Sequence, residues 1–139
     1  MEATEARRLF ATAPVARLAS VDAVGKPHLV PICFALDGDT LYTAVDRKPK
    51  RTTRLRRLAN VAANPRVSVL ADRYDDDWST LWWVRADGIA RIVAAGAEEH
   101  ARAIALLSAR YSQYEDEPPE GPTIVVAVSR WSGWRMTPG

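Results

Sequence analysis

One strongly basic segment, set between two stretches with strand character, constrains this chain more than any other feature. It runs from Asp46 to Asp72 as DRKPKRTTRLRRLANVAANPRVSVLAD. Seven Lys or Arg residues lie between positions 47 and 57, although the whole chain of 139 residues has a net charge of only +2. Such a concentration of positive charge at a helix start is typical of a phosphate site, in which backbone N–H groups and cationic side chains hold the anion. A solvated arginine-rich helix face is the alternative interpretation, and the segment alone favours neither.

The basic segment itself predicts a helix. Thr52 or Thr53 can cap its first turn, because a threonine hydroxyl accepts a hydrogen bond from a backbone N–H. Apolar residues recur behind the cap at helical spacing, and Asn64-Pro65 ends the helix. The expected apolar positions are Leu55, Leu58, Ala59 and Ala62. The expected flanking and outward positions are Arg54, Arg56, Arg57 and Asn60.

Short alternating stretches separated by Gly and Pro turns predict strands over most of the remaining chain. The expected strands are residues 16–21, 28–36, 40–45, 66–71, 78–94, 123–128 and 130–136, and the further helices are residues 2–11 and 97–114. Six or seven strands in mostly hairpin order, with two or three helices, predict a mainly β fold: a small antiparallel barrel with helices packed outside. Residues 1–139 are expected to form a single domain.

Two positions are expected to shape these strands. Pro31 interrupts the second strand, so this point is expected to be an edge, a bulge or an opening toward a ligand. Gly88 lies in the long stretch 78–94, where a bulge or bend would let one strand curl.

Composition excludes several classes of protein. No run of about 18 apolar residues is present, and the N-terminus lacks the apolar region of a signal peptide, so a cytoplasmic location is expected. The lone cysteine, Cys33, lies in an apolar run and is expected to be a small core residue. No spacing of Cys and His suits a metal, and the acidic run Asp75–Asp77 is best explained as a solvated turn.

The chain carries little acid–base or nucleophilic machinery. Its two histidines are His28 and His100, and His100 is expected at the surface of a helix. A barrel with a cationic segment and without evident proton-transfer residues indicates that a cofactor does the chemistry. Three features support this: a broken strand at Gly25–Ile32 that could expose backbone groups to a flat heterocycle, a phosphate-binding cluster around Lys48–Thr53, and a shared aromatic surface. The residues of that surface are Trp78, Trp82 and Trp83, for which core or interface packing is the alternative.

The order of these elements resembles a known family. The stretches G-x-P-x-x-x-P at Gly25–Pro31 and K-x-K-R-T-x-R-L…NPR-V-S from Lys48 to Ser68, with the closing RWSGW, are similar to the split β-barrel oxidoreductases of the pyridoxamine-phosphate-oxidase-like (PPOX) class. The chain looks most like the deazaflavin (F-420)-dependent branch of actinobacteria. Sixteen arginines against three lysines indicate a GC-rich genome, which agrees with that branch.

The resemblance implies a homodimer with two cofactor sites at the subunit interface. It implies that Lys48, Lys50, Arg51 and Thr52 contact the cofactor phosphate. It also implies that His28, Pro31 and Ile32 lie along the deazaflavin ring with Thr43 and Ala44, and that Trp78 lies near the cofactor. Some relatives carry a polar side chain at the position of Pro31, so ring contacts there would be apolar or through the backbone. The implied reaction is hydride transfer between F-420 and a small unsaturated organic substrate, without a catalytic residue that the sequence identifies.

Two other functions fit the same residues. An FMN-dependent oxidase or flavin-binding protein could use the same barrel and phosphate site. A nucleic-acid-binding module could use Arg47–Arg57, but the acidic stretches Asp72–Asp77 and Glu115–Glu120 oppose it, so no nucleic-acid partner and no membrane partner are expected. Trp131 and Trp134 are expected to pack at the dimer interface or to close the partner's substrate pocket.

Overall fold

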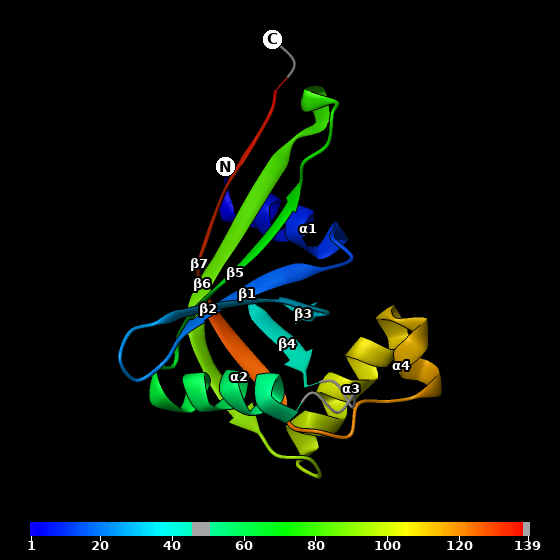
Figure 1. Ribbon diagram of the computed structural model, residues 1–139. Coiled ribbons are helices and arrows are strands. Elements are labelled where there is room, and N and C mark those ends of the chain that lie inside the picture. The colour runs from blue at the N-terminus through cyan, green and yellow to red at the C-terminus, as the bar shows by residue number, and fades with distance from the viewer. Residues whose placement is uncertain (46–50, 138–139) are drawn as a thin grey trace.

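Seven strands form one antiparallel sheet in the order β2-β1-β5-β6-β7-β4-β3 (Figure 1). This computed structural model describes residues 1–45 and 51–137, and for residues 51–55 it describes the backbone alone. The strands are β1 (Ala16–Val21), β2 (Pro27–Ile32), β3 (Ala35–Asp37), β4 (Thr40–Ala44), β5 (Arg66–Arg73), β6 (Trp82–Val93) and β7 (Thr123–Arg135). The expected mainly antiparallel architecture with flanking helices is therefore confirmed.

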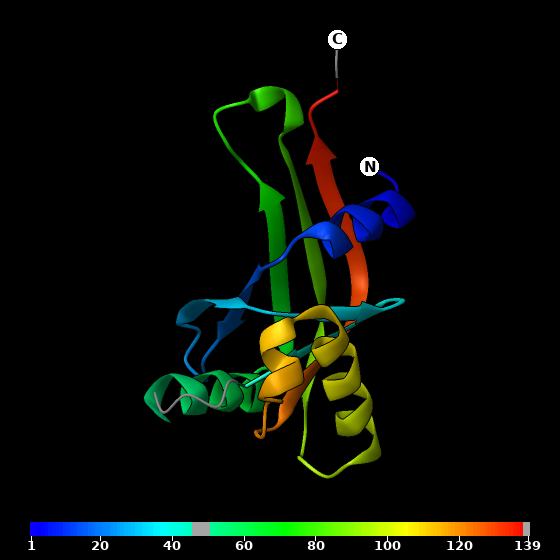
Figure 2. The same cartoon turned by 90° about the vertical axis from the view of Figure 1, so that its right-hand side faces the viewer.

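The helices flank the sheet. They are α1 (Ala3–Thr12), α2 (Arg51–Ala63), α3 (Glu98–Arg110) and α4 (Ser112–Asp116), with a 3-10 turn, η1 (Trp78–Thr80), between β5 and β6. α1 packs on β6 and β7, α2 on β1 and β6, and α3 on β3 and β4. Figures 1 and 2 show β5, β6 and β7 rising away from α2 and α3, with η1 at the far end.

Alternation along the strands separates a helix-covered inner face from an open outer face. In β6, Trp82, Val84, Ala86 and Ala90 are buried, whereas Arg85 and Ile89 between them are exposed. Phe10 of α1 anchors the core, because its ring makes edge contacts with Phe34 at 4.8 Å and with Trp131 at 5.3 Å between centroids. These contacts place α1 over the inner face and leave the outer face of β2, β1, β5 and β6 to solvent in one chain.

The expected irregularity at Gly88 is present, but the extra residue lies on the neighbouring strand. Asp87 pairs with Arg130 and Gly88 pairs with Val128, so Ser129 of β7 has no partner on β6. The expectation of two strands around Ser129 is wrong, since β7 runs on through this bulge. A Cβ on Gly88 would lie 2.3 Å from the carbonyl oxygen of Ala127, which explains why glycine occupies this position.

The stretch 28–36 is divided differently from the prediction. Pro31 lies inside β2, where it pairs with Arg17, so the expected interruption at this residue is wrong. The expectation of an edge is confirmed, because β2 is an outermost strand and a missing N–H there costs no ladder bond. The chain leaves β2 after Ile32 and pairs again as β3 with β4.

Four expectations for the helices are corrected by the structure. α2 begins at Arg51, so Thr52 and Thr53 lie within the helix. It buries Asn60 and Val61 and exposes Ala59 and Ala62, which reverses part of the expected stripe. The helix expected over 97–114 is divided into α3 and α4. His100 of α3 is buried, with Nε2 at 2.9 Å from the carbonyl oxygen of Gly121, because loop 117–122 folds over it.

Candidate functional site

A cavity of about 520 Å³ lies between the β1–β2 hairpin and α2. The hairpin contributes Asp22, Lys26, Pro27 and His28, and α2 contributes Arg56, Ala59 and Asn60. The hairpin turn is held by Asp22, whose carboxylate accepts the backbone N–H groups of Val24 at 3.0 Å and Lys26 at 2.8 Å. These bonds, that of Lys26 foremost, hold the pKa of Asp22 below its ordinary value. One oxygen of this carboxylate is thereby engaged by the hairpin, and the rim carries two cations, Lys26 and Arg56, beside the one anion Asp22.

The floor of this cavity is polar. Ser20 and His28 are paired across β1 and β2, and the amide of Asn60 donates a 3.2 Å hydrogen bond to Ser20 Oγ. His28 Nδ1 is buried without a hydrogen-bond partner among the described residues. Burial, followed by the charges of Arg56 and Arg57, lowers the pKa of His28 below its ordinary 6.5. The imidazole is therefore mainly neutral at pH 7.

The structure separates the residues predicted to line the cofactor ring. His28 and Ile32 face the interior side of β2, whereas Pro31 is exposed on the other side. Ile32, Thr43 and Ala44 are buried at 4%, 1% and 6% exposure, and the hydroxyl of Thr43 donates to the carbonyl of Cys33 at 2.7 Å. Their side chains thus belong to the core, and a ring would meet this region through backbone or through Pro31.

The predicted phosphate residues are only partly described. Lys48 and Lys50 lie outside the described residues. Arg51 and Thr52 form the first turn of α2, of which the backbone is described. α2 thus begins inside the basic segment, and the start of a helix is a place where anions bind in other proteins.

The three tryptophans expected to share one surface do not. Trp78 is 70% exposed in η1, at the opposite end of β5 and β6 from α2 (Figure 1). Trp82 is buried in the core, and Trp83 faces the other side of β6 because neighbouring residues of a strand point to opposite faces. Within one chain, Trp78 is therefore remote from the cavity at α2.

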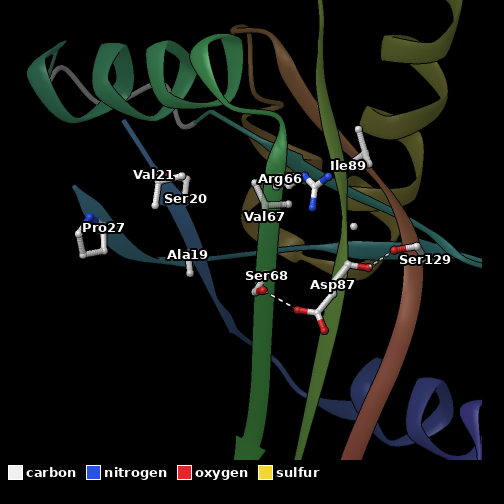
Figure 3. Close-up of a pocket in the computed structure, with 11 residues that line it drawn as sticks. Ala19, Ser20, Val21, Pro27, Arg66, Val67, Ser68, Asp87, Ile89 and Ser129 are labelled. Carbon is white, nitrogen blue, oxygen red and sulfur yellow. Dashed lines mark hydrogen bonds between the residues drawn. The ribbon is translucent and has the colours of Figure 1, made fainter. Parts of the chain in front are cut away.

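Figure 3 shows a second cavity, of about 380 Å³, on the outer face beside the bulge. Asp87 organises it by accepting the Ser68 hydroxyl at 2.5 Å and Arg85 Nε at 3.2 Å, while Ser129 Oγ donates to the Asp87 carbonyl at 3.1 Å. A neighbouring hollow of about 530 Å³ lies over Leu29, Leu70 and Trp83. The sequence analysis missed these hollows and the Ser20–Asn60 pair. The alternation of buried and exposed positions in β1 and β6 is the signal that could have indicated them.

Trp131 and Trp134 lie on opposite faces of the sheet. Trp131 packs on Phe10 and donates from Nε1 to Asp39 at 2.9 Å, so it stabilises its own chain. Trp134 is 40% exposed on the outer face, where it pairs with Trp83.

The described residues contain neither a cluster of metal ligands nor a helix that could cross a membrane. No group of three or more His, Cys, Asp or Glu residues is arranged to hold a metal within the described part of the chain. Across residues 1–45 and 51–137, none of the helices has the length and apolar character needed to cross a membrane.

The fold is shared with solved structures. A conserved hypothetical protein from Mycobacterium tuberculosis superposes with a TM-score of 0.76 at 20% identity, covering 100% of this chain and 90% of that chain. An FAD-binding protein from Mesorhizobium loti gives 0.70 at 22% identity, covering 96% and 94%. The heme storage protein HutZ from Vibrio cholerae gives 0.72 at 18% identity, covering 97% and 95%. At these identities the likeness concerns the fold.

Sequence comparison gives the family. No curated protein matches the chain. The family model described as pyridoxamine 5'-phosphate oxidase matches residues 3–135, from the first turn of α1 to the last residue of β7. The split-barrel fold expected from the sequence is therefore confirmed, and the chain belongs to the pyridoxamine 5'-phosphate oxidase family.

Proposed function

We propose that this chain is an oxidoreductase that binds the deazaflavin coenzyme F-420 and transfers hydride between it and a small unsaturated organic substrate. The observation that carries the proposal is the cationic cavity at α2, with the unpartnered His28 Nδ1 in its floor. Such a site fits the anionic end of a nucleotide-like cofactor, because an anion would offset the charges of Lys26 and Arg56.

The chain's residues would divide the work of holding the cofactor. Lys48, Lys50, Arg51 and Thr52 would bind its phosphate at the start of α2. The ring would lie along β2, near the exposed Pro31, with the backbone of β4 around Thr43 and Ala44 behind it. When bound, F-420 supplies the hydride at its ring, and the protein orients ring and substrate and excludes water.

We further propose that two copies of the chain pair through the open outer face. Leu29, Ile89 and Trp134 are 68%, 49% and 40% exposed on this face. A monomer seldom exposes so many large apolar side chains together unless they form an interface. A second copy would also explain Trp78, since only a partner could bring this residue toward a site near α2. The expected homodimer with cofactor sites at the interface is retained on these grounds.

Titration with purified cofactors tests the assignment. We expect F-420 to bind the purified protein with a change in its fluorescence, and the reduced coenzyme to be consumed when a substrate is found. Replacing Lys50 and Arg51 by Ala should abolish binding, whereas Arg8→Ala, on the exposed side of α1, should not. Failure of F-420 to bind, together with tight copurification of FMN, would assign the chain to the flavin-dependent members instead.

A flavin cofactor is the second candidate, favoured by the similarity to the FAD-binding protein of Mesorhizobium loti. The absorption spectrum of the purified protein separates the candidates, since a flavin absorbs and often copurifies. A Soret band would instead support heme, in line with the similarity to HutZ. Steeply salt-dependent retention of nucleic acid would favour the nucleic-acid-binding function.

A further inference from the structure

The register of β5 and β6 arranges their outward side chains in rows across the outer face. The rows are Asp72 with Trp83, Leu70 with Arg85, Ser68 with Asp87, and Arg66 with Ile89. Figure 3 shows two of them, with Ser68 bonded to Asp87 and with Arg66 and Ile89 beside them. In the middle of this pattern lies the pair Val69 and Ala86, whose side chains are buried on the inner face. The outer face therefore carries a fixed order of charged and apolar positions on either side of that pair.

This order is complementary to itself about Ala86. Outward residues at equal distances on either side of the Val69–Ala86 pair are either opposite in charge or both apolar. They are Arg85 and Asp87, Trp83 and Ile89, and, on β5, Asp72 and Arg66. A two-fold interface needs such a pattern, because it sets residue i of one copy against residue j of the other and j against i. The face thus matches a second copy of this chain.

Other overlays of β6 on a second copy bring like charges together. Packed sheets keep their strands within about 30° of each other, so β6 meets its copy either parallel or antiparallel. In a parallel overlay in register, Arg85 would face Arg85 of the partner. An antiparallel overlay shifted by one residue would set Arg85 against itself, or Asp87 against itself. Like charges directly opposed are costly, so the overlay centred on Ala86 is favoured over these three.

The groups at the centre are already placed for contact with a partner. Arg85 directs Nε toward Asp87 Oδ2 at 3.2 Å, and its two terminal amino groups form no hydrogen bond with a described residue. Asp87 Oδ1 accepts the Ser68 hydroxyl, which fixes the carboxylate. The side chains of Arg85 and Asp87 are 45% and 31% exposed. Nearby, Asp72 lies 3.7 Å from Arg17, too far for a hydrogen bond. Each copy therefore offers anchored carboxylates and unused donors.

The two hollows of the outer face exchange places in this overlay. Trp83 lines the hollow of about 530 Å³, and Ile89 lines the cavity of about 380 Å³ beside the bulge. An axis at Ala86 sets Ile89 of one copy over the first and Trp83 of the other copy over the second. Apolar side chains then enter both hollows from the partner, as in the packed core of an interface.

We infer that two copies pair about a two-fold axis that crosses the strands at Ala86, with Arg85 of each copy bound to Asp87 of its partner. The inference rests on the pairing put forward with the proposed function. It also completes the site, because Ala90 donates to the carbonyl of Pro65, just after α2, at 2.7 Å. Ala90 is as far from Ala86 as Trp82 is, so the axis carries η1 of the partner to the end of α2.

Charge reversals that complement each other test this axis. Arg85→Asp and Asp87→Arg each set like charges against one another at two symmetric positions. Each variant alone should form a dimer at least about a hundredfold weaker than wild type, about tenfold for each position. An equimolar mixture restores opposite charges at both positions and should form a mixed dimer. Native mass spectrometry separates mixed from identical pairs by mass, and circular dichroism checks that each variant is folded.

A second pair and a control keep the test independent of one position. Asp72→Arg and Arg66→Asp should behave in the same way, alone and mixed. Arg8→Asp makes a similar change of charge on the exposed side of α1, so it should dimerise like wild type and should not rescue Asp87→Arg.

Two results would overturn the inference. One is that the reversed variants pair as tightly as wild type, and the other is that folded variants of both charge pairs stay monomeric when mixed. A monomeric wild type would remove the pairing altogether. Titration of the wild-type dimer with F-420 is a separate measurement: if the mixed dimers form and F-420 does not bind, the proposed cofactor fails while the axis stands.

Discussion

His28 connects the chemistry of the site with the stability of the fold. It lies on β2 beside the cavity at α2, with Nδ1 buried and with the charges of Arg56 and Arg57 near enough to disfavour a further positive charge. The neutral form is therefore favoured in the folded protein. An anion in the cavity would reverse this preference, because a negative charge next to the ring favours the imidazolium.

This preference predicts a pH dependence of stability in the ligand-free protein. The pKa of His28 in the folded state lies below its ordinary 6.5, so below about pH 6.5 the unfolded chain binds a proton that the folded chain resists. Folding stability from this residue is thus complete above that pH and is lost as the pH falls. The melting temperature of wild type should decline more steeply between pH 7 and 5 than that of His28→Gln. Parallel profiles for the two proteins would contradict the prediction.

Buried polar residues were the least predictable part of the sequence. His100 and Asn60 both lie on helices whose pattern suggested that they face outward. Each can be buried because a group distant in the sequence forms a hydrogen bond with it. The partner of His100 is the carbonyl oxygen of Gly121, and the partner of Asn60 is the hydroxyl of Ser20. Helical periodicity reports which side of a helix is apolar, whereas the partner of a polar side chain is set by tertiary packing. The basic segment, in contrast, is visible in the sequence because its charges are contiguous, and its role in binding a phosphate stays a prediction.

At the scale of elements, Arg110 ties three segments that are far apart in the sequence. It ends α3 and donates to the carbonyl of Phe34 at 2.8 Å, to that of Ala11 at 3.1 Å and to that of Ala13. Its guanidinium also lies 4.3 Å from the centre of the Phe34 ring. Through these contacts α3 holds both the end of α1 and the connection between β2 and β3. The contacts therefore help to set the point at which the chain leaves β2 and turns toward β3.

Removal of this arginine should therefore destabilise the whole domain. Arg110→Ala leaves the carbonyl groups of Phe34 and Ala13 without their charged donor, and we expect a loss of about 2–4 kcal/mol in the free energy of unfolding. Arg102→Ala, which removes an exposed arginine of the same helix, should change it by less than about 0.5 kcal/mol. Urea denaturation followed by circular dichroism measures both. Equal effects of the two variants would show that the Arg110 contacts do not stabilise the fold.

Strands were predicted well where alternation alone decides them, as in β1, which begins and ends at the predicted residues. The division of 28–36 into β2 and β3 was missed because it depends on which strand pairs with which. The pairing of β2 with β1 ends at Ile32, and Ala35 and Leu36 then pair with Tyr42 and Leu41 of β4. The bulge was located to within one residue pair, although sequence could not say that Ser129 rather than Gly88 is the inserted residue.

For the whole molecule, the fold class followed from the number and order of short strands, and the family match over residues 3–135 confirms it. The site was less accessible, because its parts come from β1, β2 and α2, and because Trp78 lies at the far end of the same chain. Residues that meet only across two copies cannot be placed by reading one chain. The proposed pairing is therefore the step on which the complete site depends.

The pairing through the outer face predicts the mass of the protein in solution. Wild type should sediment at about twice 15.4 kDa. Leu29→Glu puts a charge into the proposed interface, and it should yield a folded monomer because Leu29 is 68% exposed in one chain. Val24→Glu is the matched control, since Val24 is 89% exposed at the hairpin turn. Analytical ultracentrifugation with circular dichroism gives mass and fold together.

A monomeric wild type, or a Leu29→Glu variant that remains dimeric, would show that the outer face is not the interface. Retention of F-420 binding in the folded Leu29→Glu monomer would show that the complete cofactor site lies within one chain.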